Sequence, residues 1–188
     1  MRALVSAVVL VACAACAPTP VLLDHQAPAT LQEEPAGYER AEVVHVIDGD
    51  TIDVLITEVV AGPGAGEAVP GAEYRVRLLG IDTPESVDPR SAVECFGREA
   101  SAAAEALLED EEVVLVKDVE ETDQYERLLR FVYLGGEMAN ARLVVNGYAH
   151  AYTYPPNVRW SELLVQLERA ARDNDRGLWG PDTCDGDS

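Results

Sequence analysis

The sequence predicts an α+β fold, a mainly β architecture in which a five-stranded β-barrel carries about three helices. Short runs rich in β-branched residues, which are typical of strands, occupy residues 42–60 and 74–79 and recur at 112–116 and 128–134. Alanine-rich or one-sided apolar segments, which are typical of helices, separate and follow these runs. At 188 residues, 48% of them hydrophobic, the chain is long enough for one domain with its own core.

The first three strands are expected to form two hairpins. Runs 42–47 and 51–60 are joined by Asp48-Gly49-Asp50, which is a hairpin turn signal. A Gly- and Pro-rich stretch at 61–71 then leads to an alternating strand at 74–79. We expect this stretch to be a long, mobile loop at the tip of the second hairpin.

The remaining elements alternate between helix and strand. An alanine-rich helix is expected at 99–108, strands at 112–116 and 128–134, and a short helix at 139–146. The final helix, 159–174, has its apolar residues on one side. Three strands, a helix, two strands and two helices is the order of an OB-fold barrel with helical additions.

The N-terminus has the features of an export signal. Arg2 precedes an apolar run, residues 3–12, that is too short to span a bilayer. Small residues precede Cys13 and Cys16, a pattern that resembles the lipobox of bacterial lipoproteins. Lipidation of either one, with Cys13 the better fit, would anchor the chain to a membrane. The alternative is an ordinary signal peptide that is removed with both cysteines.

Proline content divides the rest of the chain. Residues 17–40 contain four prolines and no periodicity, so we expect a flexible tether between the signal, 1–16, and the folded domain. The domain is predicted over 41–182, and 183–188 form a short acidic tail.

Cys95 and Cys184 are the cysteines of the mature chain. An exported pair is free to oxidise, and closing so long a loop would stabilise the fold by roughly 3–5 kcal/mol on the loop-entropy argument. We expect a disulfide that pins the C-terminal tail. The alternatives are a metal pair or two free thiols, although no His or Cys partners lie at zinc-type spacing.

The formal net charge of -20 limits how the chain can meet nucleic acid. A strongly acidic protein is repelled by nucleic acid at long range, so nucleic-acid chemistry must depend on a local basic cleft and bound cations. The same composition is typical of a protein adapted to high salt, where repulsion is screened within a few ångströms.

Carboxylates gather on loops beside the ends of predicted strands. Asp48 and Asp50 lie in the first turn, Asp82 and Glu85 follow the third strand, and Asp123 precedes the fifth. Hard oxygen ligands in turns suit Ca²⁺ or Mg²⁺. Asp-Gly-Asp is also ordinary turn chemistry, so the first pair alone does not predict a metal site.

Five motifs in order resemble those of the staphylococcal nuclease (thermonuclease) family of SNase-like domains: 47–51, 76–85, 96–101, 122–127 and 146–149. The resemblance extends over about residues 42–179, and five ordered motifs are more specific than any one of them. It implies a secreted or envelope-anchored Ca²⁺-dependent nuclease, a phosphodiesterase acting on DNA or RNA. We expect a monomer that meets the membrane only through an N-terminal lipid.

The resemblance implies the metal site residue by residue. Asp50 and Asp82 resemble the carboxylate ligands of a single Ca²⁺, and the backbone carbonyl of Thr83 resembles a third ligand. Asp48 matches an acid that lies behind the metal in the family.

The resemblance also implies three catalytic side chains. Glu85 resembles the group that orients or deprotonates the attacking water, and Arg77 and Arg127 resemble the pair that grips the scissile phosphate. Planar guanidiniums suit the charge that builds on phosphate oxygens during attack. Taken alone, Arg77 could equally be a surface strand residue, and Arg127 could pair with Glu126 or Asp123.

Tyr125, Tyr152 and Tyr154 match aromatic positions that line the nucleotide pocket of the family, although the last two could also be half-buried packing residues. Glu126 departs from the family, which has glycine before this arginine. We therefore expect the turn to be made without a positive φ, or the loop to be rearranged. Glu126 and the acidic surface favour an alternative function, a catalytically silent OB module that binds nucleic acid or protein at the cell envelope.

Overall fold

A computed structural model describes residues 23–25, 35–86 and 94–184. The expected export signal, with Cys13 and Cys16, lies outside the described residues, as does most of the expected tether. Within the described part of the chain, no helix is long and apolar enough to cross a membrane.

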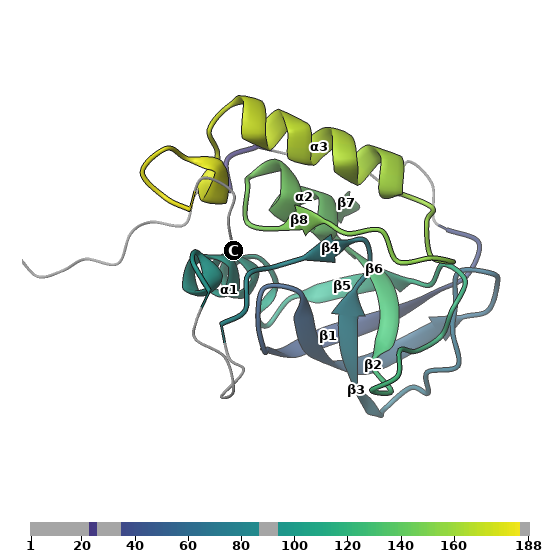
Figure 1. Ribbon diagram of the computed structural model, residues 1–188. Helices are drawn as coiled ribbons and strands as arrows, with labels where there is room; N and C mark the ends of the chain where they lie inside the picture. Colours follow the sequence, from purple (N-terminus) through teal and green to yellow (C-terminus); the bar gives the residue numbers. More distant parts are fainter. Residues whose placement is uncertain (1–22, 26–34, 87–93, 185–188) are drawn as a thin grey trace, which may run out of the picture.

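Five strands close into a barrel, and the predicted fold class is confirmed (Figure 1). Neighbouring strands run antiparallel in the order β3-β2-β1-β5-β6, and β3 pairs with β6 in parallel, with Val76 opposite Leu128, to close the barrel. The strands are β1 (Tyr38–Val46), β2 (Thr51–Val60), β3 (Glu73–Leu78), β5 (Glu112–Val116) and β6 (Leu128–Leu134).

The burial pattern of each strand follows its place in the barrel. In β2, Ile52, Val54 and Ile56 point inward and are fully buried, whereas the residues between them are partly exposed. In β6 both faces are buried over residues 128–133, because α2 (Ala139–Val145) covers the outer face.

Helices gather at one side of the barrel (Figure 1). α2 packs between β6 and α3 (Ser161–Asp173), and α1 (Gly97–Leu108) buries an alanine-rich face against β1 and α2. The remaining elements are short: β4 (Ile81–Asp82), β7 (Glu137–Met138), β8 (His150–Ala151) and a 3₁₀ turn η1 (Gly177–Trp179). β4 and β8 pair antiparallel beside the barrel.

The stretch 61–72 is packed against the barrel, which differs from the mobile loop expected from its composition. The Gly64 amide donates to Ala36 O at 3.0 Å, and Gly64 O accepts the Lys117 amide at 2.8 Å. The Gly66 amide donates to the buried carboxylate of Glu39 at 2.6 Å. The anchors come from distant parts of the chain, so local composition did not reveal them.

A buried ion cluster lies under this stretch. Arg130, fully buried on β6, donates to both carboxylate oxygens of Glu39 at 3.0 Å and also pairs with Glu121. A Cβ added at Gly66 would lie 2.0 Å from Arg130 Nη2, so glycine is the residue that lets the backbone cover the cluster.

The first and the last of the described residues are both fastened to the domain. Cys95 and Cys184, 89 residues apart, form a disulfide. At the other end, the Asn146 side chain exchanges two hydrogen bonds with the backbone of His25, and Arg142 donates to Leu23 O. β1 begins at Tyr38, three residues before the predicted start of the domain at Ala41.

Candidate active site

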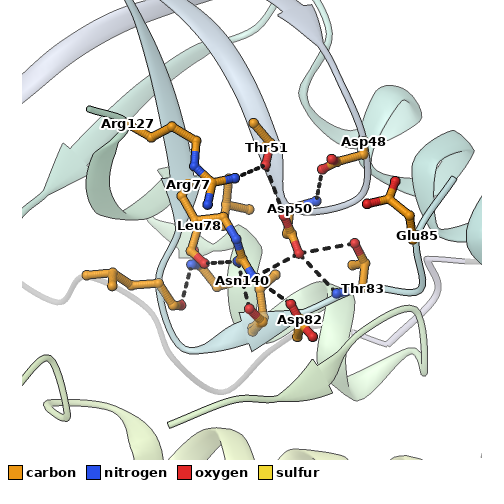
Figure 2. Close-up of polar contacts among 12 residues, drawn as sticks. Asp48, Asp50, Thr51, Arg77, Leu78, Asp82, Thr83, Glu85, Arg127 and Asn140 are labelled. Carbon is orange, nitrogen blue, oxygen red and sulfur yellow. Dashed lines mark hydrogen bonds and ion pairs between the residues drawn. The ribbon is translucent and has the colours of Figure 1, made fainter. Parts of the chain in front are cut away.

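The residues predicted to bind metal and to act in catalysis lie close together: Asp50, Arg77, Asp82, Thr83, Glu85 and Arg127 (Figure 2). Asp48 and Asp50 lie in the β1–β2 turn, which is docked onto β3 because the Leu78 amide donates to Asp50 O at 2.8 Å. The buried side chain of Asn140 fixes the neighbouring corner, accepting from the Val132 amide and donating to Leu79 O, each at 2.9 Å. Sequence reasoning missed Asn140.

Asp50 is the centre of the site and is only 6% exposed. Its Oδ2 accepts the amide of Thr83 at 3.0 Å and the Thr83 hydroxyl at 3.2 Å. A Cβ at Gly49 would lie 2.7 Å from Thr83 Cγ2, so glycine in the Asp-Gly-Asp turn allows Thr83 to approach. The turn and the loop after β4 therefore fit together as one unit.

Arg77 fills the space between the two predicted metal ligands. Its Nη2 lies 3.1 Å from Asp50 Oδ2 and 2.6 Å from Asp82 Oδ1, and its side chain is 15% exposed. Its Nη1 donates to the backbone carbonyls of Leu78 and Ile81. One guanidinium thus holds the two carboxylates together.

Negative charge exceeds positive charge around this guanidinium. Burial, reinforced by the charge of Asp50, raises the pKa of Asp48 to about 6. Burial also raises the pKa of Asp82, although Arg77 opposes the shift. Three carboxylates therefore share one arginine, and an additional cation would stabilise their ionised forms.

The residues present fit a hard divalent cation. Asp50 and Asp82 offer carboxylate oxygens and Thr83 a backbone carbonyl, which are the donor types that Ca²⁺ prefers. Among the residues that the structure describes, no three His, Cys, Asp or Glu side chains are grouped closely enough to hold a metal without other ligands. Water and substrate oxygens would complete such a coordination shell.

Arg127 is held by Asp123. Arg127 Nε donates to Asp123 Oδ2 at 2.7 Å, and the Arg127 amide donates to Oδ1 at 3.0 Å. Asp123 therefore serves the arginine turn and does not join the carboxylates near Asp50, which corrects its grouping with them as a candidate hard ligand. The structural pairing considered for Arg127 is real, and its partner is Asp123.

Thr51 connects the two arginine positions. Its buried hydroxyl accepts from Arg127 Nη1 at 3.4 Å and donates to Asp50 Oδ1 at 3.0 Å. Figure 2 shows this continuous path from Arg127 to Asp50. Sequence reasoning missed the contribution of Thr51, although it directly follows the Asp-Gly-Asp turn.

Glu126 makes the turn with a positive φ, contrary to expectation. Its φ is 65°, a left-handed conformation that glycine adopts more easily. The Glu126 amide donates to Asp123 O at 3.1 Å, and the Asp123 amide donates to Arg127 O at 3.0 Å, so the turn is closed on both sides. Glu126 therefore holds a left-handed backbone conformation at the cost of local strain.

A cavity of about 250 Å³ opens beside the arginines. Tyr125 is 71% exposed and Tyr152 is 50% exposed, so both offer ring surface to solvent. The Arg127 guanidinium lies 5.5 Å from the centre of the Tyr125 ring. The cavity lining includes both arginines and all three tyrosines predicted for the site: Arg77, Arg127, Tyr125, Tyr152 and Tyr154.

Glu85 lies at the other side of the carboxylates, after Pro84. Its carboxylate is turned back toward the Asp48–Asp50 turn (Figure 2). Its amide donates to Glu94 Oε2 at 2.7 Å, and its carbonyl accepts the Glu94 amide at 2.9 Å. Glu94 was not among the predicted site residues, although it stands just before the motif at 96–101.

Comparisons with known proteins show the family to which the chain is similar. Residues 75–181 match the family model described as staphylococcal nuclease homologue. The chain is 35% identical to a thermonuclease of Staphylococcus hyicus over 144 residues, which cover 77% of this chain and 78% of the relative. It is 38% identical to a thermonuclease of Staphylococcus intermedius over 137 residues, or 73% and 74% of the two chains. The endonuclease YncB of Bacillus subtilis (strain 168) is 32% identical over 135 residues, or 71% and 58%.

Proposed function

Because this chain belongs to the staphylococcal nuclease family, we propose that it is a Ca²⁺-dependent nuclease that hydrolyses phosphodiester bonds of DNA or RNA. The observation that carries the proposal is the placement of Arg77 and Arg127 on one cavity, with Asp82 beside them and exposed tyrosine rings at its wall. The relatives named thermonuclease and endonuclease support the same reaction class.

Arg77 and Arg127 bind the scissile phosphate in this proposal. In-line attack on a phosphodiester builds negative charge on the nonbridging oxygens, and guanidiniums that offer paired N–H donors stabilise that charge. Asp123 and Thr51 fix Arg127 before substrate arrives, so little reorganisation remains for the reaction itself.

Glu85 orients the attacking water and accepts its proton. A carboxylate serves as a base only within hydrogen-bond reach of that water. The location of Glu85 beside the Asp48–Asp50 turn supports this role.

The proposed ligands of a single Ca²⁺ are the carboxylates of Asp50 and Asp82 and the backbone carbonyl of Thr83. When bound, the ion would act as a Lewis acid that draws negative charge from a phosphate oxygen. The raised pKa of Asp82, which follows mainly from burial, supports a need for added positive charge at this place.

The exposed rings of Tyr125 and Tyr152, with Tyr154, stack on bases next to the cleaved bond. Every base has a π-face, so stacking of this kind tolerates many sequences. The proposal therefore extends to a nuclease with weak sequence preference.

The proposed location is outside the cytoplasm, either at the envelope through a lipid on Cys13 or Cys16, or free. A disulfide between Cys95 and Cys184 supports an oxidising compartment, since such bonds are rare in reducing ones. The proposed domain order is signal, tether, nuclease domain over about 41–182, and acidic tail, in a monomer.

A second candidate is a silent barrel that binds nucleic acid or protein without cutting it. The formal charge of -20 favours it, because it weakens long-range attraction to a polyanion. Glu126 also favours it, because it adds a carboxylate next to Arg127.

Cleavage by the purified chain from residue 17 onward separates the two candidates. Single-stranded DNA, duplex DNA and RNA are tested with Ca²⁺, with Mg²⁺ and with chelator, at several salt concentrations. We expect Ca²⁺-dependent cutting that falls at least about a hundredfold in Glu85→Gln and Arg77→Ala. Arg75→Ala is the matched control, because Arg75 lies on the same strand in an exposed pair with Asp53. No cutting under any condition contradicts the nuclease proposal.

A further inference from the structure

The backbone of Glu85 is held between Glu94 and the first turn of α1. The reciprocal hydrogen bonds to Glu94, at 2.7 and 2.9 Å, fix both the amide and the carbonyl of Glu85. A Cβ added at Gly97 would lie 2.6 Å from Glu85 O and 3.1 Å from Pro84 O. Glycine at the start of α1 therefore lets the helix rest directly on the Glu85 peptide.

The segment that holds Glu85 is joined covalently to the C-terminus. Cys95 directly follows Glu94 and is bonded to Cys184. Glu94 and Cys95 are both exposed, and so is the hydrogen bond from the Glu85 amide to the Glu94 carboxylate. Hydrogen bonds exposed to water open more readily than buried ones, and a covalent bond next to them limits that opening.

The other end of the disulfide is firmly anchored. The Thr183 amide donates to Gly180 O at 3.0 Å, and its hydroxyl donates to Gly177 O at 3.0 Å. The Leu178 amide donates to Gly147 O at 2.9 Å, and added Cβ atoms at Gly147 and Gly177 would each lie 2.2 Å from backbone of the opposite turn. Cys184 is thus attached to a turn packed tightly on the end of α2.

We propose that the Cys95–Cys184 disulfide is a positioning device for Glu85 that acts through Glu94. The inference rests on the proposed role of Glu85 as the residue that orients water. A base contributes only when held at reaction distance, so loosening the Glu94 contact lowers kcat. KM is unaffected, because phosphate and bases are bound by the arginines and tyrosines on the other side of the carboxylates.

Four variants of the full mature chain test the proposal. Glu94→Ala removes the acceptor of the Glu85 amide, whereas Glu94→Gln keeps an acceptor oxygen at the same reach. Cys95→Ser combined with Cys184→Ser removes the covalent link. Glu99→Ala is the matched control, because Glu99 is an exposed acid in the first turn of α1, close to Glu94 in the sequence. Each variant is measured for kcat, KM, melting temperature and the exchange rate of the Glu85 amide by NMR.

We expect Glu94→Ala and the double cysteine variant to lower kcat about tenfold with KM within about twofold. Glu94→Gln retains at least about half of kcat, and Glu99→Ala is unchanged. The Glu85 amide exchanges at least about tenfold faster in the first two variants, while amides within β2 keep their rates.

Unchanged kcat and unchanged Glu85 exchange in both altered proteins would overturn the proposal. An effect of Glu94→Ala without one from the double cysteine variant would overturn the part assigned to the disulfide. If the double variant does not fold, wild-type protein reduced with a phosphine replaces it. If the wild-type chain cuts nothing, the proposed function fails, and the amide exchange still decides whether the disulfide and Glu94 hold Glu85.

Discussion

Asp123 directs both of its carboxylate oxygens at Arg127, one to the side-chain Nε at 2.7 Å and the other to the backbone amide at 3.0 Å. The Asp123 side chain is only 7% exposed, so solvent competes little for either contact. The arginine is thereby fixed in backbone position and in side-chain direction.

Asp123→Ala is expected to lower kcat/KM at least about tenfold, because Arg127 loses the partner that aims it at the phosphate. The free energy of unfolding falls by about 1–3 kcal/mol, since the amides of Tyr125 and Arg127 and the Arg127 guanidinium lose a largely buried acceptor. Steady-state cleavage and denaturant unfolding measure the two effects. Asp53→Ala breaks the exposed pair with Arg75 and serves as the control, with less than about 1 kcal/mol lost. Wild-type kinetics in Asp123→Ala would show that Arg127 needs no such support.

Glu126→Gly is expected to stabilise the protein by about 1 kcal/mol, because glycine adopts a φ of 65° without the Cβ clash. Glu105→Gly makes the same change at an exposed position inside α1 and is expected to cost about 1 kcal/mol. Urea unfolding of both variants tests the opposite signs. Glu126→Gln keeps the positive φ and removes the negative charge. A higher kcat/KM in this variant at low salt would show that the Glu126 carboxylate competes with phosphate for Arg127.

Glu39→Gln is expected to destabilise the protein by about 3–5 kcal/mol, because the guanidinium of Arg130 loses the charged partner that is fully buried with it and keeps the partly exposed Glu121. Gln keeps one acceptor oxygen where Glu39 has two, so the Gly66 amide and the Arg130 guanidinium must share it. Glu58→Gln breaks an exposed pair with Arg40 and should cost less than about 1 kcal/mol. Denaturant unfolding measures the loss of unfolding free energy in each variant. Equal losses in the two variants would show that burial of the cluster does not make its ion pair more important for stability.

Glu121 is expected to contribute to acid unfolding. Burial alone would raise its pKa, but hydrogen bonds from Arg130 and the Glu67 amide, with the charge of Arg130, lower it below the ordinary value of 4.5. A carboxyl whose folded pKa is lowered adds stability that is present above pH 4.5 and lost as the pH falls through the folded value. In Glu121→Gln the free energy of unfolding should therefore fall less steeply below pH 4.5 than in wild type. An identical pH dependence in both proteins contradicts this assignment.

Ca²⁺ at about a hundred times its dissociation constant should raise the melting temperature by about 5–10 °C, as expected for binding to the folded state alone. Asp82→Ala should abolish this shift, because it removes a proposed ligand whose side chain is 55% exposed and contributes little to packing. Asp53→Ala keeps the shift. Differential scanning calorimetry with Ca²⁺ and with chelator makes the comparison, and a full shift in Asp82→Ala would exclude Asp82 as a ligand.

The order of the barrel strands could be predicted because each strand carries its own pattern of β-branched residues between turn signals. The packed state of 61–72 could not, because its anchors are Glu39 and Lys117, far away in the sequence. The Glu126 turn was judged by steric preference alone. The hydrogen bonds between Asp123 and Arg127 that close it depend on tertiary structure and outweigh that preference.

The candidate site, like the fold, could be predicted from the sequence only in part. Charged residues at motif positions could be singled out as candidates, whereas Thr51, Asn140 and Glu94 act through contacts that reach residues up to 76 positions away. Polar residues of these types are common throughout any sequence. Only the folded chain shows which of them support the site.

The attachment of Leu23 to Arg142 and of His25 to Asn146 sets how far the barrel could stand from a lipid. Leu23 follows Cys16 by seven residues, and an extended chain covers at most about 3.6 Å per residue, or ~25 Å in all. A lipid on Cys16 would therefore keep Leu23 within about 25 Å of the membrane, so the proposed nuclease would act on strands that come to the membrane surface.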